Sequence, residues 1–328
     1  MVQRSSADWL MVVAAWLVIL SATTLLSAGV IYGDAASVSG LQRALLDAPA
    51  TEANIQVRTR REPDASAPAI ERAITSDLRS ALGSTGGDVL RLARSESFGL
   101  PGQRQVSRLV VFGSYEGIER HAELVGGSWP ASAADGPVEA ALSEPAAAQL
   151  GLALGNRLQV ASRADPTHTV DAAVVGIYRV ARREDPYWWA DQLELDGAAT
   201  SGSFTTLGPL VVTRDDLMGR VIAGKAELTW RVFPAFDRIS LADATRLRGA
   251  VDGLDERLAA EVGDFRYVRV ATKLGAILGG LERSLLVSRT GVLVLTAQLA
   301  VLAGYALVLV AGLLIERRRI ETALLRSR

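Results

Sequence analysis

The sequence predicts an α+β membrane protein in which two transmembrane helices flank a mixed α/β extracytoplasmic domain with a small β-rich subdomain. Two uncharged stretches, 9–32 and 290–315, are each long enough to cross a bilayer. The residues between them alternate between strand-like and helix-like hydrophobic periods. Arginines gather directly after the second stretch, and this asymmetry orients both helices.

The composition excludes several classes of function. The 328 residues carry a net charge of −1 and no cysteine. A near-neutral chain offers no global basic surface for a nucleic-acid backbone, so we expect no nucleic-acid partner. Without cysteine there is no disulfide, no thiolate nucleophile and no Cys-ligated zinc.

The first uncharged stretch, 9–32, is predicted to be a transmembrane helix. A helix of this length reaches about 36 Å, more than the ~30 Å hydrocarbon core. Trp9 and Tyr32 lie at its ends, where amphipathic rings favour the headgroup layer. A cleaved signal peptide is the alternative, but the stretch is longer than the usual hydrophobic region and only Arg4 precedes it. Residues 1–8 are then a cytoplasmic N-terminus.

The extracytoplasmic α+β domain is assigned to residues 33–272. Its first half combines apolar positions three or four residues apart, which predict helices, with period-two alternation, which predicts strands. In chain order we expect a helix at 37–46, a strand at 54–60, a helix at 67–82 closed by Gly83, and strands at 89–94 and 106–114.

A β-rich subdomain is expected at about 126–180, because its apolar runs are short and bounded by turn residues. We expect strands at 138–142, 157–161 and 169–178, a helix at 144–150, and a turn at Gly155-Asn156.

The second half of the domain repeats the mixed pattern. The expected elements are a strand at 210–213, a helix at 215–222, a strand at 227–232, a helix at 241–262 and a strand at 267–270. Residues 273–289 then form a stalk helix, since Leu274 to Leu286 keep a helical apolar spacing up to the second uncharged stretch. A plain connector packed on the domain fits that periodicity equally well.

The second transmembrane helix is predicted at 290–315 and is followed by a cytoplasmic tail, 316–328. This tail carries five arginines against two glutamates, which marks its side of the membrane as cytoplasmic. Both termini are then expected on the cytoplasmic side of a bacterial cell membrane, and the large domain on the extracytoplasmic side.

Small residues recur every seven positions in both predicted membrane helices, a spacing that lets two helix backbones approach closely. An alanine-rich chain produces the same recurrence by chance. The candidate helix-packing seam consists of Ala15, Ala22, Gly29, Ala297, Gly304 and Ala311.

No catalytic, cofactor-binding or metal-binding residue is predicted. Residues 219–226 nearly spell a phosphate-binding loop, but Ala226 replaces the Ser or Thr that holds magnesium. His121 and His168 show no metal-ligand spacing and are expected on the surface or in loops. Asp215-Asp216 is interpreted as helix capping and first-turn charge.

The aromatic run Pro186-Tyr187-Trp188-Trp189 has two interpretations. Exposed aromatics beside charges often mark a contact surface. Core or loop anchoring is favoured here, because large aromatics are usually buried.

Several segments together resemble the N-terminal part of an FtsX-like (MacB-type) ABC transporter permease. They are 124–130 (LVGGSWP), 137–160 (PVEAALSEPAAAQLGLALGNRLQV), 174–180 (VVGIYRV), the DPYWW run, 228–232 (LTWRV) and the charged C-terminal segment IERRRIETALLRSR. Each motif is weak alone, but their order and their coincidence with both helices make the match fairly specific. Family members continue into at least two further membrane helices, so we expect this chain to be a fragment of a longer permease.

The resemblance implies a non-catalytic membrane subunit that couples a separate cytoplasmic ABC ATPase to an extracytoplasmic domain. The work would be export, lipoprotein or lipid handling, or mechanotransmission. It also implies an ATPase contact after the second helix, carried by Arg317, Arg318, Arg319, Glu321, Leu324 and Leu325. Charge alone explains these arginines equally well as anchors at anionic headgroups.

The expected partners are the ATPase subunit and membrane lipids, with a second permease copy and an extracytoplasmic partner as further candidates. No cofactor is expected. The alternative function is a two-helix transmembrane sensor or receptor with an extracytoplasmic ligand-binding domain. An extracytoplasmic enzyme tethered at both ends is a third reading, without a convincing catalytic constellation.

Overall fold

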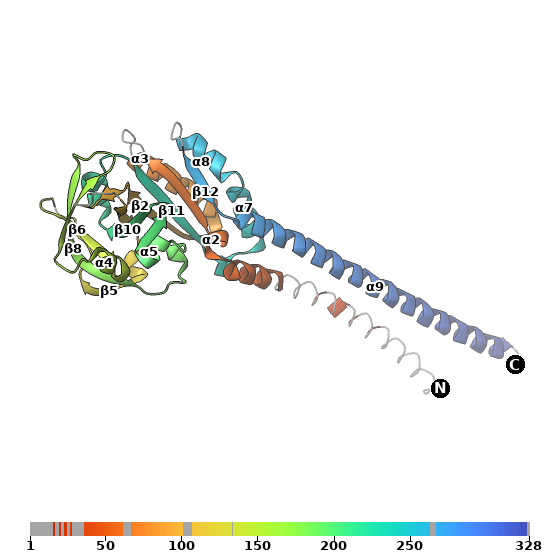
Figure 1. Cartoon of the computed structure of the whole chain (residues 1–328). Helices are drawn as coiled ribbons and strands as arrows, with labels where there is room; N and C mark the ends of the chain where they lie inside the picture. The colour runs from red at the N-terminus through yellow and green to blue at the C-terminus, as the bar shows by residue number, and fades with distance from the viewer. Residues whose placement is uncertain are drawn as a thin grey trace. The chain divides into compact units, whose positions relative to one another are not determined.

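The computed structural model describes residues 36–61, 67–100, 107–132, 134–262 and 267–326, together with residues 16, 20, 23, 24 and 27 (Figure 1). The chain divides into two units. One consists of Met1–Ala44 and Gly279–Arg328, and the other of Leu45–Leu278.

The predicted membrane segments belong to the first unit. Apart from five scattered positions, 9–32 lies outside the described residues, while 290–315 falls on helix α9 (Leu274–Arg326). No helix within the described residues combines the length and apolarity needed to cross a membrane. Helix α9 begins at Leu274, one residue after the expected start of the stalk, and continues through the second uncharged stretch.

The second unit is mixed α/β and is built on one twelve-stranded sheet. One part of it, called the sheet lobe below, has the strand order β12-β1-β11-β2. Its strands are β1 (Ile55–Arg61), β2 (Gly87–Ser95), β11 (Ala226–Pro234) and β12 (Val268–Ala271). All its pairings are antiparallel, so strands from the two ends of the domain lie next to each other.

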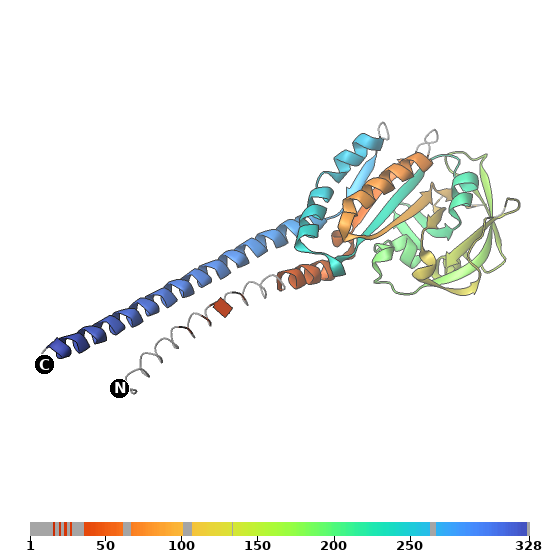
Figure 2. The ribbon, with the colours of Figure 1, turned by 180° about the vertical axis from the view of Figure 1, so that it is seen from behind.

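Helices α3 (Ala67–Leu82), α7 (Leu241–Val251) and α8 (Leu254–Val262) cover one face of the sheet lobe (Figure 2). Helix α3 buries a stripe that includes Ile70, Ile74 and Leu78, which is the helical spacing seen in the sequence. On the strand side Trp230 of β11 is buried, and its Nε1 donates to Thr75 Oγ1 of α3 at 2.9 Å. The hydrogen bond satisfies the indole N–H, which would be costly to bury unpaired.

The other part of the sheet closes on itself and is called the strand ring below. Its order is β4-β3-β7-β8-β6-β10, and a parallel pairing of β10 with β4 closes it. The strands are β3 (Phe98–Gly99), β4 (Arg108–Tyr115), β6 (Val138–Ser143), β7 (Arg157–Ser162), β8 (Thr169–Val180) and β10 (Phe204–Val211). Strand β5 (Ala122–Gly127) pairs with β8, and β9 (Ala198–Ser201) pairs with β10.

Short helices complete the unit. They are α2 (Ala50–Ala53), α4 (Glu144–Leu150), α5 (Gln192–Asp196) and α6 (Arg214–Asp216). The structure confirms the helix predicted at 144–150. Ser143 caps it by accepting from the backbone N–H of Ala146, and Gly151 ends it in the left-handed conformation.

Two helices predicted from the sequence were wrong in form. The helix expected at 241–262 is interrupted between α7 and α8, where Gly253 adopts a φ of 75° that other residues rarely tolerate. The helix expected at 215–222 is the short α6 followed by a π-helical turn, Leu217–Val221. The strand expected at 210–213 lies earlier, at 204–211.

The aromatic run at 186–189 is core, as the favoured interpretation predicted. Tyr187 and Trp188 are each only 1% exposed. They belong to a buried cluster with side chains from both parts of the sheet: Leu90 and Leu92 from β2, Tyr115, Ile118, Ala122, Ala141, Tyr178 and Val211. The run therefore packs where the sheet lobe meets the strand ring.

Candidate functional site

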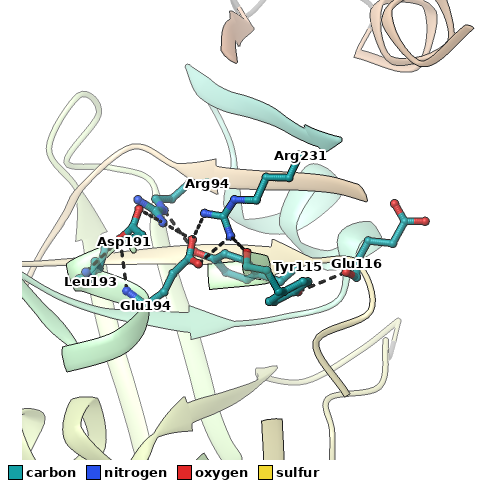
Figure 3. A network of polar contacts seen from close by, with 8 residues as sticks. Arg94, Tyr115, Glu116, Asp191, Leu193, Glu194 and Arg231 are labelled. Carbon is teal, nitrogen blue, oxygen red and sulfur yellow. Dashed lines mark hydrogen bonds and ion pairs between the residues drawn. The ribbon is translucent and has the colours of Figure 1, made fainter. Parts of the chain in front are cut away.

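The strongest polar constellation in the domain is a buried charge network around Glu194 of α5 (Figure 3). Arg231 of β11 donates to both carboxylate oxygens of Glu194, each at 2.9 Å. Arg94 of β2 donates to the same carboxylate at 2.8 Å. Glu194 is 1% exposed and Arg231 is 2% exposed, so water does not screen this contact.

A second carboxylate completes the network. Asp191 accepts from Arg94 at 3.1 Å and caps α5 by accepting from the backbone N–H groups of Leu193 and Glu194. Arg94 also donates to the hydroxyl of Tyr115 at 3.2 Å. Two guanidinium groups thus face two carboxylates, and the cluster is electrically balanced.

The environment shifts the pKa values in this network in opposite directions. Burial raises the pKa of Glu194, against the opposing effect of Arg231 and Arg94. Burial would also raise the pKa of Asp191, but the charges of Arg94 and Arg231 and the hydrogen bonds it accepts outweigh burial and lower it. Burial raises the pKa of Tyr115 far above its ordinary value, so its hydroxyl stays neutral.

The network joins three elements that are distant in sequence. Arg231 also donates to the carbonyl oxygen of Tyr187, so one guanidinium holds both α5 and the aromatic run. Because the charged groups are engaged with one another, the arrangement fixes segment 185–197 against the sheet rather than presenting a reactive group. The two parts of the sheet are also joined directly, because β2 pairs antiparallel with β4, with Arg94 opposite Gly113; the network adds a side-chain connection beside that ladder.

A second constellation joins the start and the end of the domain. The backbone N–H of Lys273 donates to the carbonyl oxygen of Glu52 at 2.9 Å. Its Nζ also lies 2.6 Å from Glu52 Oε1. Strands β1 and β12, which follow Glu52 and precede Lys273, pair antiparallel, with Gln56 opposite Ala271. The two ends of the domain are therefore in direct contact.

The residues predicted as sites lie in the other unit. Ala297, Gly304 and Ala311 are on α9, whereas Ala15, Ala22 and Gly29 lie outside the described residues. The predicted ATPase-contact residues are all on the last turns of α9: Arg317, Arg318, Arg319, Glu321, Leu324 and Leu325. The surroundings of their side chains are outside the described part of the chain, so the contact stays a prediction.

Both histidines lie in turns but are half-buried rather than on the open surface. His121 stacks on Tyr187 with ring centroids 3.9 Å apart, and its Nδ1 is 2.9 Å from Asp185 Oδ2. His168 Nε2 is 2.9 Å from the carbonyl oxygen of Val221. Within the described ranges, no group of three or more His, Asp and Glu side chains is placed to hold a metal ion.

The other rejected motifs have plain structural roles. Residues 219–226 run from the π-helical turn into β11, whereas a phosphate-binding loop leads into a helix. Asp215 and Asp216 lie in the first turn of α6, as interpreted from the sequence, and the cap is the side chain of Thr213.

Sequence reasoning missed the charge network. Its members stand singly among apolar neighbours, as Arg231 does in LTWRV and Glu194 in QLELD. Alternation along β11 could have singled out Arg231, because it points away from the face that buries Trp230 and Val232. Nothing in the sequence connects it with Glu194, 37 positions earlier.

No protein family matches the chain, and no curated protein is similar to it. Among solved structures, a domain assigned to a permease protein of Porphyromonas gingivalis is similar, with 15% sequence identity and a TM-score of 0.29. The likeness covers 69% of this chain and 91% of that one.

Proposed function

We propose that the chain is a permease-type membrane subunit, or the N-terminal part of one, that couples a separate cytoplasmic ATPase to its extracytoplasmic domain. In this proposal the segments 9–32 and 290–315 cross the membrane, and the tail 316–328 contacts the ATPase. The chain itself performs no hydrolysis, and the domain moves when the helices move.

The observation that carries the proposal is the contact between Glu52 and Lys273. Chain ends that lie close together are common in domains, but here the strand that follows the first predicted membrane segment pairs directly with the strand that precedes the second. The backbone hydrogen bond and the ion pair hold the ends together at distances of 2.9 and 2.6 Å. A displacement of α9, which follows Lys273, relative to the segment that ends at Glu52 would therefore act on both β1 and β12.

The side chains of α9 support a membrane role for this helix. Its large apolar residues are strongly exposed, among them Leu293, Val301 and Val308 at 66%, 72% and 68%. Exposed apolar patches of this kind mark contact with lipid or with another protein. The arginines that follow in the sequence suit the cytoplasmic headgroup layer and a carboxylate-bearing partner.

Co-purification tests the proposal. The chain is expressed in its native host, solubilised in detergent and captured by a tag on its N-terminus, and the ATPase subunits that co-purify are quantified. We expect Arg317→Ala/Arg318→Ala/Arg319→Ala and Leu324→Ala/Leu325→Ala to reduce the recovered ATPase at least about ten-fold, as loss of central interface residues does. Arg326→Ala, in the same tail but outside the predicted contact, is the matched control.

Membrane insertion is measured in parallel on the same variants. Since the chain has no cysteine, a single Arg157→Cys in the domain can be labelled specifically on intact cells. Labelling by a membrane-impermeant maleimide should be equal in all variants. Undiminished ATPase recovery in both multiple variants would contradict the assigned contact, and an unlabelled domain in intact cells would contradict the topology.

A further inference from the structure

Helix α3 borders an open groove of about 460 Å³ in the sheet lobe. The groove is lined by α3 side chains between Pro68 and Arg79 and by Arg91 of β2. The opposite flank of α3 packs against α7 and α8, so the groove lies where the helical layer ends. Its volume is in the range of small-molecule sites.

The groove is cationic. Arg72, Arg79 and Arg91 line it against a single acid, Glu71. Arg72 and Arg79 are exposed, and neither is paired with a carboxylate among the residues that the structure describes. A concave surface with an excess of guanidinium groups attracts anions and can bind carboxylates and phosphates in a bidentate manner.

The floor of the groove is fixed before any ligand binds. Arg91 donates to Glu116 through Nε at 2.9 Å and through Nη2 at 3.2 Å. The hydrogen bond to Glu116 raises the pKa of Arg91. Glu71 is held by Arg214, which offsets the one negative charge in the lining. Arg91 and Glu116 therefore form a balanced pair that fixes the floor, and the net positive charge of the groove comes from Arg72 and Arg79.

The spacing of the two exposed arginines sets the shape of the ligand. Arg72 and Arg79 are seven residues apart on α3, which is about two turns, or ~10.5 Å along the axis. Ser76 lies between them with its side chain exposed on the same flank. A ligand lying along the helix would meet a cation, a hydroxyl and a second cation.

We infer that this groove binds an elongated molecule with two acidic groups about 10 Å apart, either carboxylates or phosphates. The site is separate from the ATPase contact, so it stands or falls independently of the proposed function. The arginines supply the affinity, and their separation selects the length of the ligand.

Calorimetric titration of the full chain in detergent tests the inference with two long probes and one short one. Azelate, with nine carbons, and the bisphosphate of 1,9-nonanediol can reach both arginines, whereas succinate cannot. We expect at least one long probe to bind about ten-fold more tightly than succinate. Which of the two binds better distinguishes a carboxylate ligand from a phosphate ligand.

Substitutions localise the binding. Arg72→Ala and Arg79→Ala should each weaken the better long probe about ten-fold, and Arg72→Lys should retain part of the affinity. Arg157→Ala, at an arginine of β7 whose side chain is 67% exposed, should leave binding unchanged. Circular dichroism checks that each variant is folded.

Three outcomes overturn the inference. They are no binding of either long probe at millimolar concentration, equal binding of succinate, and an equal loss in Arg157→Ala. The last would mean that the probes respond to overall charge rather than to this groove.

Discussion

The sheet lobe and the strand ring are parts of one sheet but are assembled from the chain in opposite ways. In the sheet lobe, β1 near the start of the domain pairs with β11 and β12 near its end. The strand ring is built from the continuous stretch between β3 and β10. The sheet lobe therefore brings together the two ends of the domain, whereas the ring is made from one segment that closes through its own long-range pairing of β4 with β10.

Segment 185–197 contacts both the sheet lobe and the strand ring. It belongs by sequence to the ring, between β8 and β9, but its charged groups are held by Arg94 and Arg231 of the sheet lobe. Its aromatic side chains fill the core between the two parts. Segment 185–197 therefore adds side-chain contacts between the two parts to the backbone ladder of β2 with β4.

Glu194→Ala should have the largest effect on this arrangement. It leaves the guanidinium of Arg231 buried without its carboxylate, and breaking a buried ion pair on one side typically costs about 3–5 kcal/mol. We expect a loss of this size in the free energy of unfolding, followed by tryptophan emission in urea. Hydrogen exchange should rise in α5 and along β11 before it rises in β7 and β8.

A double variant separates charge from shape. Glu194→Leu/Arg231→Met removes both partners and should recover much of the lost stability, since replacing a buried pair by apolar groups is often neutral. If the single and double variants are equally unstable, packing rather than charge joins the two parts of the domain.

Each region has one helix that the sequence predicted with correct bounds, α3 in the sheet lobe and α4 beside the ring. The helix at 144–150 was predictable because Ser143, Pro145 and Gly151 mark start and end locally. The closure of the ring was not predictable, because β4 and β10 pair in parallel across a long stretch of chain. Pairing partners of that kind leave no local signal.

The sheet lobe and the candidate site show the same limit. The strands of the sheet lobe were predicted from their alternating pattern, but their order in the sheet was not predicted. Glu194 and Arg231 looked unremarkable because a buried ion pair becomes visible only when both strand order and helix position are known. The break between α7 and α8 did have a signal, the Asp252-Gly253 dipeptide, whose turn preference outweighed the helical periodicity around it.

Lys273→Ala should have a smaller effect, confined to the sheet lobe. The ion pair with Glu52 is partly exposed, at 65% and 35% of the two side chains, so it contributes about 0–1 kcal/mol and less at high salt. The backbone hydrogen bond from residue 273 to Glu52 remains. We expect faster amide exchange at the ends of β1 and β12 and unchanged exchange in the strand ring.

The other lysine provides the control. Lys225→Ala removes the same type of side chain ahead of β11 and should leave exchange at the ends of β1 and β12 unchanged. If Lys273→Ala alters the ring as much as it alters β1, the end contact acts on the whole domain and the two regions are not independent.

Asp243→Asn should give the smallest effect, visible only in the dependence of stability on pH. Asp243 caps α7 of the sheet lobe, and hydrogen bonds from the side chains of Ser240 and Ser84 lower its pKa to about 2 from an ordinary 3.8. A depressed carboxyl pKa stabilises the folded state above the unfolded value, and this contribution is lost as the pH falls from 3.8 towards 2. In the variant, the free energy of unfolding should therefore fall less between pH 3.8 and pH 2 than in the unaltered chain.

Glu144→Gln is the matched test in the strand ring, where a hydrogen bond from Arg179 lowers the pKa of Glu144 at the start of α4. The sign is the same, so both variants should flatten the acid limb of an unfolding curve measured between pH 5 and pH 2. Their hydrogen-exchange patterns at low pH should differ, because Asp243→Asn changes the protection of α7 and Glu144→Gln changes the protection of α4. If acid loosens α4 and α7 together in the unaltered chain, the two regions unfold as one unit, and segment 185–197 joins them more tightly than their separate assembly from the chain suggests.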